Sequence, residues 1–127
     1  MRVQNWLRAA VIGAVLGSAV SLAKGASKPD PAAGKAVYER ECKSCHGATG
    51  KGDGEDAAYF TTKPSDLTDK AALSKRSDEF LAAVIRGGGP SKGLSKDMPA
   101  TKLSDVELQS VVAYVRQLSG TKGGKSP

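Results

Sequence analysis

The stretch Cys42-Lys43-Ser44-Cys45-His46 decides the fold, because it gathers two thiols and an imidazole within five residues. Both cysteines and the single histidine of the 127-residue chain lie in it. Two thiols at this spacing can each add to a vinyl group of one haem, and the histidine that follows is placed to bind the iron. The motif therefore predicts one covalently attached haem c, with Cys42 and Cys45 as its thioether links and His46 as an iron ligand.

Three other uses of paired cysteines fit this chain less well. A structural zinc site needs four protein ligands, whereas the chain offers only three cysteine and histidine side chains. A redox-active pair of the thioredoxin type belongs to a βαβ unit, and the flanks here are typical of a helix and a glycine-rich loop. A disulfide between residues so close in sequence would close a very small loop and stabilise the fold little. Haem attachment is the favoured interpretation.

The first 23 residues have the composition of a secretory signal peptide. Arg2 and Arg8 give a positively charged start, and the run from Ala9 to Leu22 is uncharged and largely apolar over 14 residues. Ser21-Leu22-Ala23 then supplies small residues for cleavage. The apolar run is short for a bilayer span, which needs about 20 residues. We therefore expect a cleaved signal peptide, with an uncleaved membrane anchor as the alternative.

A secretory signal agrees with the cysteine motif, because bacteria attach haem c outside the cytoplasmic membrane. A free pair of thiols would tend to oxidise in that compartment. We therefore expect the mature protein to be periplasmic, or membrane-anchored if the signal peptide remains attached.

The remainder of the chain is long enough for one domain. We expect residues 24–29 to be a flexible leader, residues 30–120 to form the domain, and residues 121–127 to be a polar, disordered tail. Removing residues 1–23 takes away two arginines and no acidic residue, which lowers the net charge from +6 to +4. A charge this small gives no reason to expect a nucleic-acid partner.

Four short helices are expected in the domain, and no segment alternates polar and apolar residues for long enough to suggest a strand. Their expected ranges are residues 32–42, 69–74, 78–86 and 105–119, preceded by the capping residues Asp30, Thr68, Ser77 and Ser104. Gly34 and Tyr38 share one face of the first helix. Glycine inside a helix costs about 1 kcal/mol against alanine, so we expect another helix to cross closely there, in an all-α fold.

The segment 47–54 that follows His46 contains four glycines. It lacks the G-K-[ST] ending and the preceding strand of a phosphate-binding loop. We therefore expect a turn that folds the backbone tightly around a flat cofactor. Asp53, Glu55 and Asp56 lack the spacing of a calcium-binding loop and are assigned to solvent.

An iron bound by one histidine needs a second axial ligand, and the composition narrows the choice. A second histidine is excluded because His46 is the only one. Met98, in the expected loop over residues 87–102, is the only methionine besides Met1, which the signal peptide would carry away. A lone methionine in a loop is ordinarily a hydrophobic plug, but elimination makes Met98 the predicted ligand. The alternative ligands are Lys92, Lys96 and Lys102.

Together these segments resemble class I c-type cytochromes, especially small bacterial mono-haem proteins and the c-type domains of cbb-type oxidases. The resemblance covers the chain from about Asp30 to Gly120 and implies a cytochrome c-like fold wrapped around one haem. In such a fold Gly34 and Tyr38 would pack the first helix against the last, near Tyr114. The matching segments are Gly34-x-x-x-Tyr38-x-x-x-Cys42-x-x-Cys45-His46-Gly47, Gly50-Lys51-Gly52-Asp53-Gly54, Pro64-Ser65-Asp66-Leu67, Ile85-Arg86-Gly87-Gly88-Gly89, Met98-Pro99-Ala100 and Leu103-Ser104-Asp105 with the helix after it.

The resemblance also implies roles for two residues outside the cysteine motif. Pro64 would offer the carbonyl that accepts a hydrogen bond from His46 and so fixes the orientation of its ring. Arg86 would contact a haem propionate, or would be a solvated charge at a helix end.

Histidine and methionine together leave no open position on the iron, so the expected function is one-electron transfer rather than enzymatic catalysis. The partners would be redox proteins, among them a membrane-bound oxidase or dehydrogenase, and we expect a monomer. A basic docking rim for acidic partners is one use for the exposed lysines, and solubility is the other; they are Lys43, Lys92, Lys96 and Lys102. Two alternatives stay open: an electron-transfer subunit of a larger dehydrogenase or oxidase, and a haem enzyme or sensor with a displaceable methionine.

Overall fold

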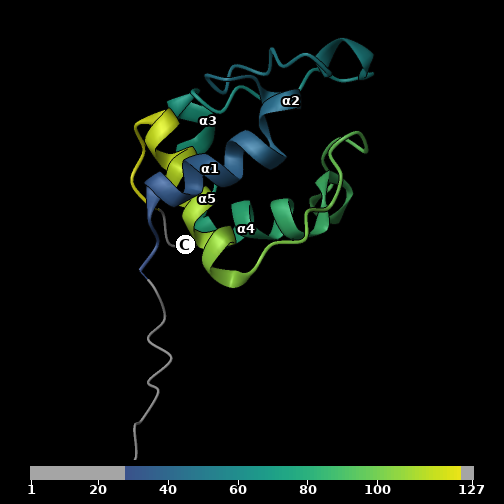
Figure 1. Cartoon of the computed structure of the whole chain (residues 1–127). Helices are drawn as coiled ribbons and strands as arrows, with labels where there is room; N and C mark the ends of the chain where they lie inside the picture. The colour runs from purple at the N-terminus through teal and green to yellow at the C-terminus, as the bar shows by residue number, and fades with distance from the viewer. Residues whose placement is uncertain (1–27, 124–127) are drawn as a thin grey trace, which may run out of the picture.

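The computed structural model describes residues 28–123, and within that range the chain consists of helices and loops without a strand (Figure 1). Its α-helices there are α1 (Pro31–Glu41), α2 (Lys43–His46), α3 (Lys70–Ser74), α4 (Asp78–Gly87) and α5 (Asp105–Ser119). Two 3-10 helices, η1 (Ala57–Tyr59) and η2 (Gly89–Lys92), lie in the connecting loops. The all-α prediction is confirmed, and α2, η1 and η2 add to the four helices expected.

The predicted signal peptide over residues 1–23 lies outside the described residues. The same holds for most of the predicted leader and for the last part of the predicted tail. Among the helices of residues 28–123, none has the length and apolar character needed to cross a membrane.

Side-chain caps determine where three of the helices begin. Asp30 caps α1, Ser77 caps α4 and Ser104 caps α5, each accepting a hydrogen bond from a backbone N–H of the first turn. At α5 the Glu107 carboxylate also accepts from the Ser104 N–H at 3.0 Å, which completes the predicted capping box. Gly120 then ends α5 in a left-handed conformation with φ 63°.

The expected cap of the short third helix is wrong by one residue. The Asp69 carboxylate, not the Thr68 hydroxyl, accepts the hydrogen bond from the Ala72 N–H, at 3.0 Å. The Thr68 backbone N–H and hydroxyl both donate to Asp66, at 2.8 and 2.6 Å. This local turn occupies Thr68, so the cap passes to the next residue.

The close crossing of α1 and α5 forms the frame of the molecule (Figure 1). Gly34 lies against the backbone of Ser110, and a Cβ at position 34 would overlap the Ser110 carbonyl oxygen. One turn further along α1, the ring of Tyr38 packs against Tyr114 of α5, with centroids 5.3 Å apart and planes tilted by 58°. The predicted packing of the first helix on the last is confirmed.

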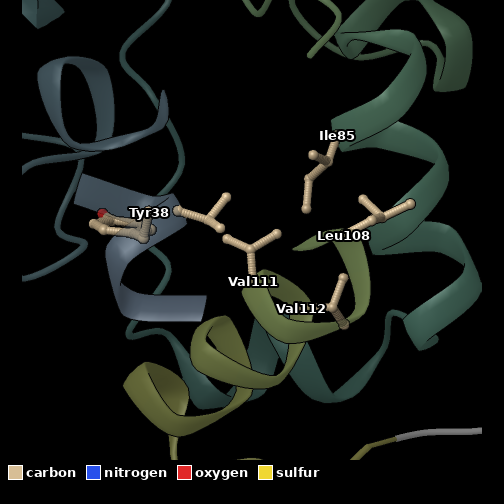
Figure 2. Close-up of a cluster of buried hydrophobic side chains, with 6 residues drawn as sticks. Tyr38, Ile85, Leu108, Val111 and Val112 are labelled. Atoms are coloured by element: carbon tan, nitrogen blue, oxygen red, sulfur yellow. The ribbon is translucent and has the colours of Figure 1, made fainter. Parts of the chain in front are cut away.

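A buried apolar cluster fills the space between α1, α4 and α5 (Figure 2). Its members are Val37, Tyr38, Ile85, Leu108, Val111 and Val112. Tyr38 and Val111 are fully buried. Two partly buried residues of the predicted haem site, Cys42 and Met98, pack against this cluster. Two segments that lie more than fifty residues apart in the sequence therefore contact the same core.

A buried arginine of α5 joins this helix to α3, to α4 and to the segment between them. The Arg116 guanidinium donates to Asp78 Oδ1 at 2.8 Å and to the Leu73 carbonyl at 2.7 Å, and it also donates to the Arg76 carbonyl. Only 5 % of Arg116 is exposed, so these partners replace the water that its charge loses. Sequence patterns gave no signal for this contact, because α5 places Arg116 at an ordinary last-turn basic position.

Candidate haem site

The cysteine motif folds as a compact turn at the end of α1. Cys42 ends α1, with its N–H donating to the Tyr38 carbonyl at 2.9 Å, and it also precedes α2. The His46 N–H donates to the Cys42 carbonyl at 2.8 Å, which winds the five residues into a single turn. Gly47 then stops α2 with φ 83°, a conformation that favours glycine.

Both thiols of the motif are free and half-buried. Burial raises the pKa of the Cys42 thiol to about 11, and the neighbouring Glu41 charge adds to the effect. The thiol is therefore protonated at neutral pH before haem attachment. Burial also lowers the pKa of His46, against the opposing effect of its hydrogen bond to Ser65. The neutral imidazole, which is the form that binds metals, is favoured.

The ring of His46 is held by a backbone carbonyl. Its Nδ1 lies 3.1 Å from the Ser65 carbonyl oxygen, and with the proton on Nδ1 this is a hydrogen bond that leaves Nε2 free for a metal. The acceptor predicted from the resemblance was the carbonyl of Pro64, one residue earlier, and the structure corrects it to Ser65. The Pro64 carbonyl instead points at Gly52, where a Cβ would overlap it.

The glycine-rich loop after His46 connects the motif to this carbonyl-bearing segment. The Gly52 N–H donates to the His46 carbonyl at 2.8 Å, and the Leu67 N–H donates to the Gly50 carbonyl at 2.6 Å. Gly50 and Gly52 both have positive φ, 84° and 71°. The loop is thus the tight backbone turn that the sequence predicts, and it holds the Pro64–Ser65 segment beside His46.

The Met98 loop is fixed to the end of α4 by backbone hydrogen bonds. The Gly89 N–H donates to the Met98 carbonyl at 3.0 Å, and the Thr101 N–H donates to the Ile85 carbonyl at 3.0 Å. Gly88 has φ 75° and allows close approach, because a Cβ there would contact the Met98 carbonyl. Met98 itself is half-buried, whereas the three alternative ligands, Lys92, Lys96 and Lys102, are exposed.

Arg86 lies in the last turn of α4, at its exposed surface. Its guanidinium pairs with the Asp105 carboxylate at 2.5 Å, which joins the end of α4 to the first turn of α5. Both side chains are largely exposed, at 57 % and 84 %. A contact of Arg86 with a haem propionate stays a prediction.

The donor atoms in this part of the structure fit a covalently bound haem. Two free thiols lie in one turn, and the imidazole beside them keeps one nitrogen available while the other is hydrogen-bonded. A thioether from a distant loop packs against the same buried cluster as Cys42. The sequence predicts these four side chains as the haem site, but it did not point to the Ser65 carbonyl, since any residue type supplies a carbonyl.

Comparison with known proteins agrees with this chemistry. The profile of the cytochrome c family matches residues 31–119. Cytochrome c-555 of Chlorobaculum tepidum is 30% identical over 111 residues, which cover 83% of this chain and 92% of that protein.

Two solved structures are also similar. One is a chain of the reducing HAO-like protein complex of Kuenenia stuttgartiensis, with 27% identity and a TM-score of 0.53 over 68% of this chain. The match spans only 41% of that longer chain. The other is a c-type cytochrome with 27% identity and a TM-score of 0.47, aligned over 70% of this chain and 96% of its own.

The family match over residues 31–119 and the relative of similar length agree with the cysteine pair and with the all-helical fold. Members of this family are typically electron carriers and typically extracytoplasmic. The chain belongs to the cytochrome c family, and it carries one covalent haem c on Cys42 and Cys45 through which it transfers electrons.

Proposed function

We propose that the protein is a one-electron carrier in which His46 and Met98 are the two axial ligands of the haem iron. One observation carries this proposal: Met98 packs against the same buried cluster as Cys42, although 56 residues separate them. Both ligand segments are fixed by backbone hydrogen bonds, His46 through Gly52 and Met98 through Gly89. When bound, the haem supplies the Fe(III)/Fe(II) couple.

The residues around the two ligands suit rapid electron transfer. The Ser65 carbonyl accepts a hydrogen bond from the Nδ1–H of His46, which fixes the ring and increases the electron donation of the other nitrogen. Met98 as the second ligand raises the reduction potential relative to a second histidine. Backbone hydrogen bonds anchor the two segments that carry His46 and Met98. Both ligands therefore stay nearly in place when the iron changes its oxidation state.

Redox proteins with acidic surfaces are the proposed partners. Lys43 in α2, Lys92 in η2, and Lys96 and Lys102 in the Met98 loop are all exposed. They flank both ligand segments, so they are suited to attract an acidic partner to this side of the molecule. The partners would act in the periplasm, free or attached to the membrane.

A second candidate is a carrier permanently attached to an enzyme. Its support is the similarity to one chain of the Kuenenia stuttgartiensis complex, although the present chain spans less than half of that one. The chemistry at the iron would be unchanged, and only the partner would differ. Purification from the native membrane and periplasmic fractions separates the two, because a subunit elutes at the mass of the complex and a shuttle elutes alone.

The ligand assignment is tested by ferric optical spectra of the haem-matured protein and two variants. We expect the weak long-wavelength band of sulfur–iron ligation in the wild type and its loss in Met98→Ala. Leu94→Ala is the matched control, because Leu94 is a partly exposed residue of the same loop, and it should keep the band. A low-spin wild-type spectrum without this band would overturn the assignment of Met98 as the ligand and would favour one of the three lysines.

A further inference from the structure

We infer that the hydroxyl of Tyr38 is a positioning group for the proximal ligand, because it fixes the carbonyl of the residue that follows His46. The Tyr38 hydroxyl donates to the Gly47 carbonyl oxygen at 2.7 Å. This inference rests on the proposed function, since it takes His46 as an iron ligand.

The donor in this hydrogen bond is held rigidly. Tyr38 is 0 % exposed, belongs to the apolar cluster and packs on the Tyr114 ring of α5. It therefore provides a fixed point on the α1–α5 frame. Burial also raises the pKa of Tyr38 well above its ordinary value, so the hydroxyl stays protonated and keeps its role as a donor.

The acceptor, by contrast, belongs to a segment whose other hydrogen bonds are local, among them the one from the Gly47 N–H to the Lys43 carbonyl of α2 at 2.8 Å. Gly47 has φ 83°, and its carbonyl accepts one further hydrogen bond, from the Gly50 N–H of the same loop at 3.2 Å. The partner of the His46 ring, Ser65, lies in an exposed loop. Of these contacts, only the one from Tyr38 comes from the helical core.

The position of the His46 ring depends on the hydrogen bonds of its backbone and on the hydrogen bond of its side chain. Its backbone carbonyl is tied to Gly52 at 2.8 Å, and its Nδ1 is tied to Ser65 at 3.1 Å. If the Gly47 carbonyl is released, the peptide between residues 47 and 48 can rotate, and the loop that leads from His46 to Gly52 loses its link to the α1–α5 frame. The ring then donates less well to Ser65, and its iron-binding nitrogen becomes a weaker electron donor.

The test is Tyr38→Phe in the haem-matured protein, with Tyr114→Phe as the matched control. Tyr38→Phe keeps the ring and its packing and removes only the donor. Tyr114 belongs to the same ring pair, and its hydroxyl makes no hydrogen bond within residues 28–123. A weaker donor stabilises ferric iron less, so we expect Tyr38→Phe to raise the reduction potential. We also expect it to shift the NMR signals of the His46 ring protons, while Tyr114→Phe leaves both unchanged.

A structural role alone gives a different result. If Tyr38→Phe lowers the denaturation midpoint but keeps the wild-type potential and His46 signals, the inference is overturned. If that variant fails to mature, the wild type provides the test: its Tyr38 hydroxyl proton should exchange slowly and show a cross-peak to Gly47, and rapid exchange overturns the inference. A wild type without low-spin histidine ligation overturns the proposed function instead.

Discussion

Gly34 of α1 lies against the Ser110 carbonyl of α5 so closely that a methyl group at position 34 would overlap the oxygen. The side chain of Ser110 reinforces this crossing, since its hydroxyl accepts a hydrogen bond from the Asp30 N–H at 3.2 Å. The α1–α5 crossing supports both Tyr38 and Cys42. The stability of the haem site should therefore depend on the smallest residue in the frame.

Gly34→Ala should destabilise the protein, although alanine is the better helix former by about 1 kcal/mol. Separating the two helices to admit a methyl group costs more, about 2 kcal/mol net, as for other overpacked cores. Denaturant unfolding of the haem-matured protein measures this. Ala33→Val adds volume at an exposed site of the same helix and should cost less than about 1 kcal/mol. Equal midpoints for the two variants would contradict the close crossing.

Arg116→Met should destabilise the protein by about 2 kcal/mol, because it leaves Asp78 and the Leu73 carbonyl without their donor. The control is Arg86→Met, which removes an exposed ion pair with Asp105. Such pairs contribute less than about 1 kcal/mol and weaken with salt. Denaturant unfolding at two salt concentrations measures both variants. A redox titration of Arg86→Met tests the predicted propionate contact separately, because the loss of such a contact would change the reduction potential of the haem.

Gly52→Ala should move the Pro64–Ser65 segment away from His46, because the new methyl group would overlap the Pro64 carbonyl. Gly93→Ala is the control: its φ of 69° is almost the same as the 71° of Gly52, but a Cβ there meets nothing within 4 Å. Both variants carry a backbone strain of about 1 kcal/mol. Only Gly52→Ala should also raise the reduction potential. Equal reduction potentials of the two variants would mean that the position of the Pro64–Ser65 segment does not depend on Gly52.

The stability of the protein should fall at high pH because of Tyr38. Its pKa is raised in the folded state by burial, then by the charges of Cys42 in the unattached chain, Tyr114 and Asp53. The unfolded chain therefore loses this proton first, at its ordinary pKa of 10.0. The stabilisation is present in full below pH 10 and is lost above it, by up to about 1.4 kcal/mol per pH unit. Unfolding measured from pH 8 to 11 should show a steeper decline in the wild type than in Tyr38→Phe, and parallel curves would contradict this origin.

Much of the fold is readable from local patterns in the sequence. The caps at Asp30, Ser77 and Ser104 and the glycine at position 34 each act within one turn or at one contact, so their residue types alone indicate the structure. Thr68 shows the limit of this approach. Two adjacent residues had suitable side chains, and a turn with Asp66 decided between them.

The parts of the site that sequence could not reveal depend on backbone atoms and on long-range packing. The acceptor for His46 is the Ser65 carbonyl, whereas the predicted acceptor was the carbonyl of Pro64. Both residues carry the same backbone carbonyl, so their residue types cannot distinguish them. The Tyr38 hydroxyl donates to the Gly47 carbonyl nine residues further along the chain, and no local sequence pattern indicates that contact. Arg116 likewise has the sequence position of a surface residue, and only its packing beside α3 and α4 buries it.

The proposed ligation of the iron by His46 and Met98 is tested most directly by adding carbon monoxide to the reduced, haem-matured wild type. Carbon monoxide binds ferrous haem only at an open or easily vacated position. We predict a low-spin ferrous spectrum that carbon monoxide leaves unchanged in the wild type, and a spectrum that carbon monoxide changes in Met98→Ala. A wild-type spectrum that shifts on addition of carbon monoxide would contradict the carrier and point to an enzyme or a ligand sensor.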